Sequence, residues 1–471
     1  MRYSKDTRGK QKTSKEGCSA ENRVEPEGMP GVLSVSAASE NGRNDDSEYP
    51  SSLLERIVDR NNLNTAYKRV KANRGSHGVD GMTVDELLPY LKEHGQAIRK
   101  AILEGNYTPK PVRRVEIPKP GGGLRQLGIP TVFDRMIQQA ILQVLTPVFD
   151  PDFSEHSYGF RPGRNAKEAV LKAKDYIEAG CTWVVDIDLA RYFDTVNHDK
   201  VMSLVARKVK DKRVLKLIRA YLNSGVMING VVVEVEEGCP QGGPLSPLLS
   251  NIMLDELDKE LEKRGHKFCR YADDCNAYVK SKRAGERVMQ NITEYLGKKL
   301  KLKVNKDKSA VGRPWKRKFL GFSFYHKKGG VGIRVHAKPL EKFKDRVREI
   351  LSRSNGRSME QRMRSLNYLI IGWVNYFELA DMKSRVAELD EWIRRRLRMC
   401  IWKQWRKIRT RHDNLVLLGI ENHKAWEYAN TRKGYWRIAG SPILSRSLTN
   451  VYLDNLGFVS VSSRYSQVRS F

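Results

Sequence analysis

Two short apolar segments near the middle of the chain each carry acidic side chains. Residues 183–188 (WVVDID) are rich in β-branched residues and predict a strand. Residues 268–279 (FCRYADDCNAYV) predict a hairpin with Asp273 and Asp274 at its tip. A carboxylate beside an apolar strand is costly unless it is solvated, paired or bound to a cation. The chain therefore needs a fold that contains strands and supplies partners for these carboxylates.

The spacing of the carboxylates suits metal chemistry. Asp186 and Asp188 lie two residues apart and hence on one face of a strand. Carboxylates from two strands make a hard oxygen site for Mg²⁺, and two such ions can hold the attacking and leaving oxygens of a phosphoryl transfer. The ordinary alternative is a turn and a strand-end cap. The two segments together favour the metal site, and the choice between Asp186 and Asp188 stays open.

The net charge indicates a polyanionic partner. Lys and Arg number 86 and Asp and Glu 55 among 471 residues, which gives a formal charge of +31. A folded chain tolerates such an excess when a polyanion neutralises it, and nucleic acid is favoured over an anionic membrane or a solvated surface. Residues 1–50 hold eight basic and nine acidic residues, which predicts a disordered tail. The positive charge therefore belongs to the folded remainder.

Neither a membrane nor an oxidising compartment is indicated. No apolar run reaches the roughly 18 residues of a membrane span, and residues 1–18 lack the apolar core of a signal peptide. The six cysteines form no CxxC pair, so we expect neither a zinc site nor a disulfide. The sequence thus predicts a cytoplasmic protein with no membrane partner.

Two glycine-rich turns are candidates for binding phosphate groups or a base pair. Residues 238–247 (GCPQGGPLSP) precede an apolar helix, and their glycines allow a close backbone approach. Lys119 and Arg125 flank the turn PGGG, an arrangement suited to clamping a polyphosphate. A plain loop and a solvated hairpin tip are the respective alternatives, and the turns alone favour neither interpretation.

The remaining pattern predicts mixed helix and strand up to about residue 335 and helices thereafter. A strand is expected over 112–117 and a hairpin over 227–233. Thr83 is the expected N-cap of an early helix, and Ser358 with Gln361 forms a capping-box pattern. Further helices are expected at 133–149, 165–179, 199–223, 245–263 and 391–410.

The helix expected over 391–410 interleaves basic and aromatic residues. This pattern suits RNA, through phosphate neutralisation and base stacking. The alternative is an amphipathic helix, and Trp392, Leu397, Ile401 and Trp405 are expected to be core. Trp436 stays open between core and contact. The expected nucleic-acid contacts are Arg394, Arg395, Arg398, Lys403, Arg406, Lys407, Arg432, Lys433, Tyr435 and Arg437.

The sequence YADD at 271–274 resembles the YADD box of reverse transcriptases. Residues 186–194 (DIDLARYFD) resemble their first acidic motif, and residues 240–251 (PQGGPLSPLLSN) resemble the box between the two. The blocks HGVDGMT, HSYGFRPGRNA, LKVNKDKS and KFLGF follow the order of group II intron reverse transcriptases. The resemblance spans about residues 52–440, and the ordered set is far more specific than a lone YxDD.

The resemblance implies an α+β right-hand polymerase, with fingers and palm built on an antiparallel sheet and an all-α thumb after them. The implied division is a tail at 1–50, fingers and palm at 51–335, a thumb/maturase (X) domain at 336–420 and a C-terminal nucleic-acid-binding extension at 421–471. Many relatives end in an HNH endonuclease domain with paired cysteines, which this sequence lacks. A primer for homing is therefore expected from elsewhere, such as a replication fork.

The resemblance also implies roles for single residues. Asp188, Asp273 and Asp274 match the catalytic aspartates, and with the carbonyl of Leu189 they are expected to bind two Mg²⁺ ions, for which Mn²⁺ can substitute. Asp186 matches no catalytic position. The residues expected around the substrates are Phe193 as the gate against a ribose 2′-hydroxyl, Lys119 and Arg125 on the triphosphate, Gln241 and Gly242 beside the nascent base pair, and Lys308 near the primer terminus.

The implied function is that of an RNA-directed DNA polymerase encoded by a group II intron. It would bind the intron RNA to assist splicing and copy it into DNA for retrohoming, with a DNA target, a primer and dNTPs as further partners, at the nucleoid in the bacterial cytoplasm. The alternatives are a reverse transcriptase of a retron or defence system and a splicing cofactor without polymerase activity. The intact acidic motifs count against the second alternative. The blocks LNYLIIGWVNYF and RKGYW favour an intron protein over the first.

Overall fold

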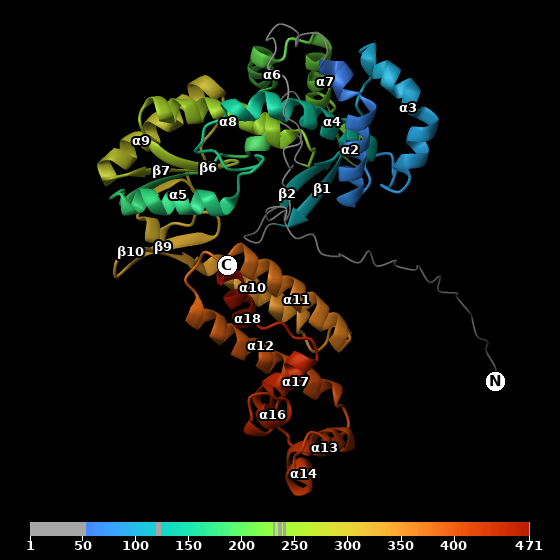
Figure 1. The fold of residues 1–471 in the computed structure, drawn as a ribbon, viewed down its shortest axis with the longest axis vertical. Helices are drawn as coiled ribbons and strands as arrows, with labels where there is room; N and C mark the ends of the chain where they lie inside the picture. The colour runs from blue at the N-terminus through green and yellow to red at the C-terminus, as the bar shows by residue number, and fades with distance from the viewer. Residues whose placement is uncertain (1–52, 119–123, 229–230, 234–237, 239–241, 471) are drawn as a thin grey trace, which may run out of the picture. The chain divides into compact units, whose positions relative to one another are not determined.

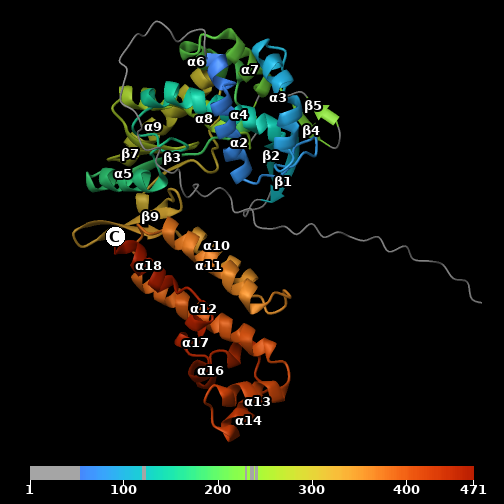
Figure 2. The ribbon, with the colours of Figure 1, turned by 45° about the vertical axis from the view of Figure 1, so that its right-hand side comes forward.

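The computed structural model describes residues 53–118, 124–228, 231–233, 238 and 242–470 and combines many helices with small sheets (Figure 1, Figure 2). The mixed helix and strand composition expected from the sequence is confirmed. The tail expected at 1–50 lies outside the described residues. In the part of the chain that the structure describes, no helix is long and apolar enough to cross a membrane.

The elements follow one another in three groups. The first group is α1 (Leu53–Ile57), α2 (Arg60–Ala72), α3 (Leu87–Leu103), β1 (Val112–Pro118), β2 (Leu124–Ile129) and α4 (Val132–Phe149). The second is α5 (Ala166–Glu178), β3 (Trp183–Ile187), α6 (His198–Lys208), α7 (Lys212–Leu222), β4 (Val226–Ile228), β5 (Val231–Val233), α8 (Ser246–Lys263), β6 (Lys267–Tyr271), β7 (Asp274–Val279), α9 (Lys282–Tyr295), β8 (Ala310–Gly312), β9 (Phe322–Lys327) and β10 (Gly330–Val335). The third is helical, with α10 (Ala337–Ile350), α11 (Met359–Tyr376), α12 (Lys383–Gln404), α13 (Ile408–Leu417), α14 (Asn422–Ala429), α15 (Tyr435–Ile438), α16 (Pro442–Ser447), α17 (Asn450–Asn455) and α18 (Val461–Arg469).

The sheet that contains the acidic segments is antiparallel, with the strand order β6-β7-β3-β8. Successive residues of β3 face opposite sides of this sheet, because side chains alternate along a strand. Val185 accordingly joins the core that includes residues of α9, and Val184 joins the core that includes residues of α5. Helices α5 and α9 thus cover opposite faces of the sheet (Figure 1).

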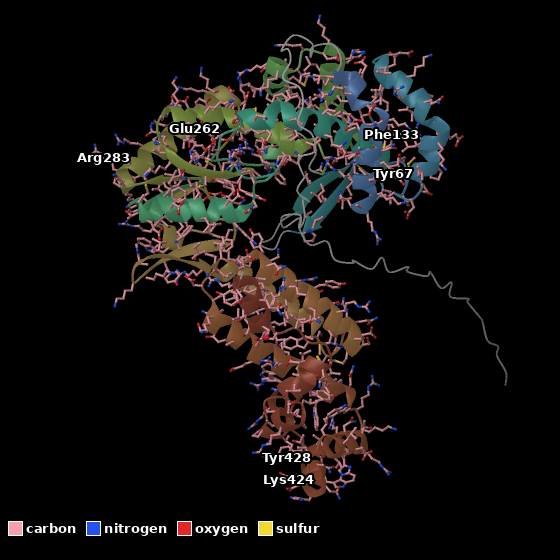
Figure 3. The ribbon with its side chains drawn as sticks, viewed as in Figure 1. Tyr67, Phe133, Glu262, Arg283, Lys424 and Tyr428 are labelled. Atoms are coloured by element: carbon pink, nitrogen blue, oxygen red, sulfur yellow. The ribbon has the colours of Figure 1, made fainter. Side chains whose placement is uncertain are left out.

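A second sheet has the order β2-β1-β4-β5, in which β1 is antiparallel to β2 and parallel to β4. The strand expected over 112–117 and the hairpin expected over 227–233 are confirmed, and the latter pairs Met227 with Val232. Helix α4 is buried along most of its length, with α2 packed against it. Tyr67 of α2 and Phe133 of α4 belong to this same core (Figure 3).

The C-terminal helices share one core with part of the strand region. The buried cluster that includes α5 continues through the β9–β10 hairpin into α10, α11 and α12. Phe343, Leu366 and Leu389 are its buried representatives on these three helices. The predicted capping box is confirmed, since Gln361 N–H donates to Ser358 Oγ and Ser358 N–H donates to the Gln361 side chain.

The prediction of a single helix over 199–223 is wrong, because the chain forms two helices there, α6 and α7. Val209 has an extended backbone with ψ 111°, which ends α6. Asp211 then accepts from the Arg213 N–H and caps α7. The extended Val209 and the Asp211 cap therefore divide a segment that the sequence pattern predicted to be one helix.

Two other helix boundaries were also predicted wrongly. The helix expected to reach residue 410 ends at Gln404, so Arg406 and Lys407 lie in the link to α13. Thr83 is not an N-cap, because its N–H and hydroxyl both donate to the Glu86 carboxylate and α3 begins only at Leu87.

Candidate functional site

The register between β3 and β7 brings the two acidic segments together. Asp186 pairs with Asn276 and Ile187 with Cys275. One further step along both antiparallel strands places Asp188 opposite Asp274. Two carboxylates that are far apart in the sequence therefore lie at the same end of the sheet.

A tight turn between β6 and β7 presents Asp273 and Asp274. Tyr271 pairs with Asp274, so only Ala272 and Asp273 connect the strands. Ala272 has φ +56°, in the left-handed region that a residue with a Cβ atom seldom adopts. Asp273 is exposed in the turn, whereas Asp274 is half-buried as the first residue of β7.

The loop before β8 holds the backbone at Asp188. Asn305 N–H donates to the Asp188 carbonyl oxygen at 2.8 Å, and Asp188 N–H donates to Ser309 Oγ at 2.9 Å. Leu189 forms a bridge to the same loop, and its side chain is buried. Lys308 Nζ lies 3.5 Å from Asp188 Oδ1. The structure thus brings Lys308, Leu189 and Asp188 together.

The carboxylates differ in their electrostatic surroundings. Loss of solvation, together with the negative charges of Asp186 and Asp273, raises the pKa of Asp274 to about 8. Burial also raises the pKa of Asp186, although Arg317 opposes this by donating from Nε to Asp186 Oδ2 at 3.0 Å. Asp186 is therefore held in an ion pair with Arg317, whereas burial and the neighbouring carboxylates disfavour the charged form of Asp274.

The donor chemistry at this end of the sheet fits a divalent cation. Asp188, Asp273 and Asp274 offer hard oxygen ligands, and a cation among them would offset the repulsion that raises the pKa of Asp274. Among the described residues, no three His, Cys, Asp or Glu side chains already form a metal-binding group.

Phe193 lies just after β3, in the short 3₁₀ turn η2 (Tyr192–Asp194), and its ring packs edge-on against Tyr192 with centroids 5.1 Å apart. Gly238, which has φ +103°, packs against the backbone of this turn. A Cβ atom on Gly238 would lie 2.9 Å from the Phe193 carbonyl oxygen. Buried His198 fixes this contact, since its Nε2 lies 2.6 Å from the Gly238 carbonyl oxygen. The sequence did not signal this role of His198.

Gly242 makes a close backbone approach, as expected for the segment 238–247. Its φ is +129°, and a Cβ atom there would lie 2.7 Å from the carbonyl oxygen of Gly128 in β2. The backbone of Arg125 belongs to the same strand and pairs with Ile117 of β1. Lys119, Gln241 and the side chain of Arg125 lie outside the described residues.

Arg270 in β6 is a residue that the sequence analysis missed. Its side chain is 1% exposed and forms an ion pair with Asp258 of α8, with Nη2 2.6 Å from Oδ2. Its Nη1 also donates to the carbonyl oxygen of Ala272 at 2.9 Å. The available signal was an arginine inside the otherwise apolar strand FCRY, since arginine is seldom buried without a partner.

Several of the predicted nucleic-acid contacts on α12 bind other parts of the protein. Arg395 lies over the Trp436 ring at 4.2 Å and donates to the Trp436 carbonyl oxygen at 3.0 Å. Arg398 donates to a backbone carbonyl of the C-terminal segment at 2.9 Å. Lys403 Nζ lies 5.0 Å from the centroid of the Tyr435 ring. These side chains therefore attach the C-terminal segment to α12.

The other basic residues of the predicted contact set in this region are either half-buried or exposed. Arg394 is half-buried over the ring of Phe458. Leu397, Ile401 and Trp405 are buried and Trp392 is partly buried, in line with their expected core role. The exposed members of the predicted contact set are Arg406, Lys407, Arg432, Lys433 and Arg437.

Comparison with known proteins decides the family. Residues 117–324 match the reverse transcriptase (RNA-dependent DNA polymerase) family, and residues 340–416 match the group II intron maturase-specific domain. Protein YkfC of Escherichia coli is 36% identical over 299 residues, which cover 55% of this chain and 78% of that protein. The chain belongs to the group II intron reverse transcriptase/maturase family.

Further relatives share shorter stretches with this family member. The group II intron-encoded protein LtrA of Lactococcus lactis is 36% identical over 206 residues, covering 44% of this chain and 34% of LtrA. A putative COX1/OXI3 intron 2 protein of Saccharomyces cerevisiae is 33% identical over 229 residues, covering 48% of this chain and 26% of that protein. The chain thus matches about a third or less of the length of these two relatives. A chain of a solved partial Cas6-RT-Cas1–Cas2 complex is 24% identical with a TM-score of 0.35, and the match covers 52% of this chain and 42% of that chain.

Family membership confirms the predicted activity class. The chain is an RNA-directed DNA polymerase with a group II intron maturase domain. Reverse transcriptases use divalent metal ions, and the maturase domain implies binding of intron RNA.

Proposed function

We propose that this protein extends a DNA primer on an RNA template at Asp188, Asp273 and Asp274, in a right-hand polymerase whose palm is the β6-β7-β3-β8 sheet. The observation that carries the proposal is the register of β3 and β7, which sets Asp188 opposite Asp274. The proposed domains are fingers and palm over 51–335, a thumb/maturase domain over 336–420 and a nucleic-acid-binding extension over 421–471. Two Mg²⁺ ions are the proposed cofactors, with Mn²⁺ as a substitute.

The acidic residues and their neighbours have separate roles in this proposal. Asp188, Asp273 and Asp274 supply oxygen ligands, together with the carbonyl of Leu189. When bound, the two cations would lower the pKa of the primer 3′-hydroxyl and stabilise the pyrophosphate leaving group. Lys308 adds a positive charge near the primer terminus, 3.5 Å from the Asp188 carboxylate.

The nucleotide is proposed to bind between the Phe193 turn and the Gly242 turn. The support is that Gly238 closely approaches the backbone of the Phe193 turn, and Gly242 closely approaches the backbone of Gly128 in β2. Lys119 and Arg125 would hold the triphosphate, and Gln241 would lie beside the nascent base pair. In this arrangement the Phe193 ring would exclude a ribose 2′-hydroxyl.

Primer extension on poly(rA) with oligo(dT) tests the polymerase proposal. Incorporation of dTTP that depends on Mg²⁺ or Mn²⁺ is the expected result. A folded protein that binds this template and primer but adds no nucleotide with either metal ion would refute the proposal. Splicing of the intron RNA at low Mg²⁺, with and without the protein, tests the maturase proposal in the same way.

Replacing Phe193 by valine should weaken the selection of deoxynucleotides. Removing the ring opens space for a 2′-hydroxyl, so the ratio of kcat/KM for dTTP over UTP is expected to fall by about 100-fold, or about 2.7 kcal/mol of discrimination. Single-nucleotide incorporation with each substrate measures this ratio. Tyr192→Phe is the matched control, because it keeps the ring that packs against Phe193, and its ratio should match that of the wild type. An unchanged ratio for Phe193→Val would exclude the gate.

We further propose that the exposed basic residues of the C-terminal region bind long RNA and thereby assist splicing. These residues are Arg406, Lys407, Arg432, Lys433 and Arg437. The copied intron would then be inserted at a DNA target for retrohoming. The match of residues 340–416 to the intron maturase-specific domain supports an intron role over a retron or defence role.

Salt should weaken RNA binding far more than nucleotide binding. Five phosphate contacts at a slope of about −0.7 each predict an affinity about 100-fold lower at 200 mM salt than at 50 mM. Filter binding across this range measures the slope, which should become shallower by about 1.4 in Arg406→Gln/Lys407→Gln. The matched control is Arg283→Gln/Arg287→Gln, which removes two exposed charges from α9. Equal salt dependence of the RNA Kd and the dNTP KM would contradict the proposal that these exposed basic residues bind RNA and not the nucleotide.

A further inference from the structure

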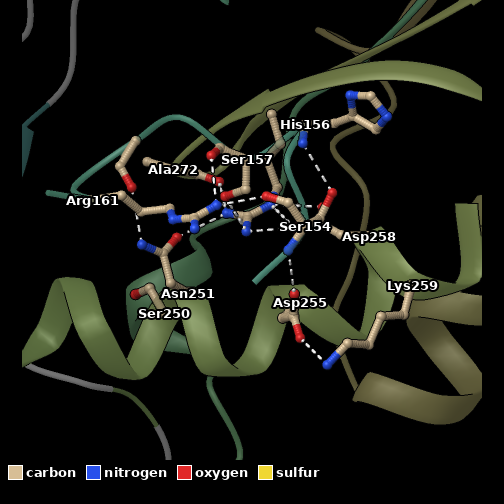
Figure 4. A network of polar contacts seen from close by, with 12 residues as sticks. Ser154, His156, Ser157, Arg161, Ser250, Asn251, Asp255, Asp258, Lys259 and Ala272 are labelled. Atoms are coloured by element: carbon tan, nitrogen blue, oxygen red, sulfur yellow. Dashed lines mark hydrogen bonds and ion pairs between the residues drawn. The ribbon is translucent and has the colours of Figure 1, made fainter. Parts of the chain in front are cut away.

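Arg270 is surrounded by partners from three separate segments of the chain. Its Nε donates to Asp258 of α8 at 2.8 Å, and its Nη2 donates to Ser157 Oγ at 2.7 Å. Its Nη1 donates to Asn251 Oδ1 at 3.0 Å and to the carbonyl oxygen of Ala272 at 2.9 Å. Figure 4 shows these partners converging. A guanidinium has five N–H groups in a rigid fork, and here its three nitrogens all have acceptors in the protein.

The contact with Ala272 is the one that bears on the chemistry. Ala272 and Asp273 form the turn between β6 and β7, and Ala272 is in the left-handed region with φ +56°. A residue with a Cβ atom keeps this conformation only when its surroundings hold it there. The bond from Arg270 fixes the carbonyl of Ala272 directly before Asp273 in the chain.

A second segment presses on the same turn. A Cβ atom on Gly159 would lie 2.3 Å from the backbone nitrogen of Ala272, so the loop around Gly159 contacts the turn backbone directly. Asn251 Nδ2 donates to the Gly159 carbonyl oxygen at 2.9 Å, while its Oδ1 accepts from Arg270. Asn251 thus joins the two supports of the turn.

Helix α8 connects this network to the other side of the proposed site. It begins at Ser246, directly after the Gly242 turn, and it carries both Asn251 and Asp258. These residues are seven apart, so they lie on one face of the helix. Arg270 therefore joins the turn that bears Asp273 to the helix that starts at the proposed nucleotide-binding turn.

We propose that Arg270 is a positioning residue, which holds Asp273 and Asp274 in place by donating to the carbonyl of Ala272 while Asp258 balances its charge. This inference rests on the proposed function, since it takes the turn to belong to the polymerase site. A buried ion pair that only stabilises the fold is the competing explanation, and buried ion pairs are weak evidence for stability.

Arg270→Lys provides the first test, because it keeps the positive charge beside Asp258 but loses the planar fork. The expected result is a 10- to 100-fold lower kcat in primer extension with a dNTP KM within about threefold of wild type. Hydrogen exchange of residues 271–275 should become at least tenfold faster, and this readout needs neither metal nor activity. The exchange result therefore decides the positioning role even if the wild-type protein extends no primer.

Arg362→Lys in α11 is the matched control. Arg362 is 5% exposed and donates from Nε to the Arg357 carbonyl oxygen and from Nη1 to the Ile350 carbonyl oxygen, so it is also a buried arginine that holds backbone carbonyls. Its replacement should lower Tm as Arg270→Lys does, with kcat and the exchange of residues 271–275 unchanged. An equal loss of kcat in both variants would show that general destabilisation is the cause and would overturn the proposal.

A double variant guards against unfolding by an unpaired buried charge. Arg270→Met/Asp258→Leu removes both charges, a type of replacement that is often neutral for stability. Thermal unfolding should show that the double variant is folded. It should nevertheless have the lower kcat and the faster hydrogen exchange at residues 271–275. Wild-type kcat and wild-type exchange in the double variant would overturn the positioning role.

Discussion

Replacing Asp273 by asparagine is expected to abolish primer extension while the fold and the affinity for RNA stay intact. The side chain is exposed in a two-residue turn, so an amide of the same shape leaves the packing unchanged. Loss of one carboxylate removes a charged ligand from a site that needs to balance divalent cations. The rate of nucleotide addition should therefore fall at least about 1,000-fold, or about 4 kcal/mol of barrier.

Single-turnover extension of a primer bound in excess protein measures this loss without interference from RNA dissociation. The matched control is Asp307→Asn, which removes an exposed carboxylate from the loop that also holds Lys308. Tm and the RNA Kd of both variants should equal those of the wild type. Extension by Asp273→Asn at more than a tenth of the wild-type rate would remove Asp273 from the catalytic set.

The sequence predicted the acidic strand and hairpin well, because their local signals are strong. β-Branched residues at 183–188 and the apolar residues on either side of Asp273-Asp274 in 268–279 identify strands without any tertiary information. The resemblance to reverse transcriptases added the choice of Asp188 over Asp186, which spacing alone left open. The structure gives a physical basis for that choice, since Asp186 is paired with Arg317 and Asp188 lies opposite Asp274.

The boundaries and supports of these elements depend on tertiary contacts and were less predictable. The break between α6 and α7 depends on Asp211, whose carboxylate caps α7 and also accepts from Leu54 N–H, far away in the sequence. The sequence shows Arg270 as an unusual charge in an apolar strand, but only the structure brings its partners Asp258, Ser157 and Asn251 around it. Composition cannot reveal such convergence, because the partners come from separate segments.

The basic helix α12 shows the same limit for binding residues. A run of arginines predicts a charged surface, yet Arg395 and Arg398 bind the C-terminal segment. The sequence treats these residues and the exposed Arg406 and Lys407 alike. Only the packing of α15 and α17 against α12 separates the arginines that hold the C-terminal segment from those that can bind a phosphate.

Truncating two tryptophans of this region should lower the free energy of unfolding by very different amounts. Trp402 is 1% exposed and packs edge-on against Trp405, so Trp402→Ala leaves a large cavity and should lower the free energy of unfolding by about 3–5 kcal/mol. Trp436 is 38% exposed under the guanidinium of Arg395, so Trp436→Ala should cost about 1 kcal/mol or less. Denaturant unfolding followed by circular dichroism measures both changes.

RNA binding separates the two residues a second time. If Trp436 also stacks on a base, Trp436→Ala loses about 1–3 kcal/mol of binding, which raises the RNA Kd about 5- to 150-fold, whereas Trp436→Phe retains a ring and most of the affinity. Trp402→Ala, measured at a temperature where it is folded, should bind RNA as the wild type does, because the buried ring cannot reach a base. A Trp402→Ala variant of wild-type stability with weakened RNA binding would reverse the assignment and make the buried face of α12 the contact surface. The pair of variants therefore tests whether aromatic residues beside arginines in this domain serve the core or the RNA, a distinction that depends on burial and not on sequence pattern.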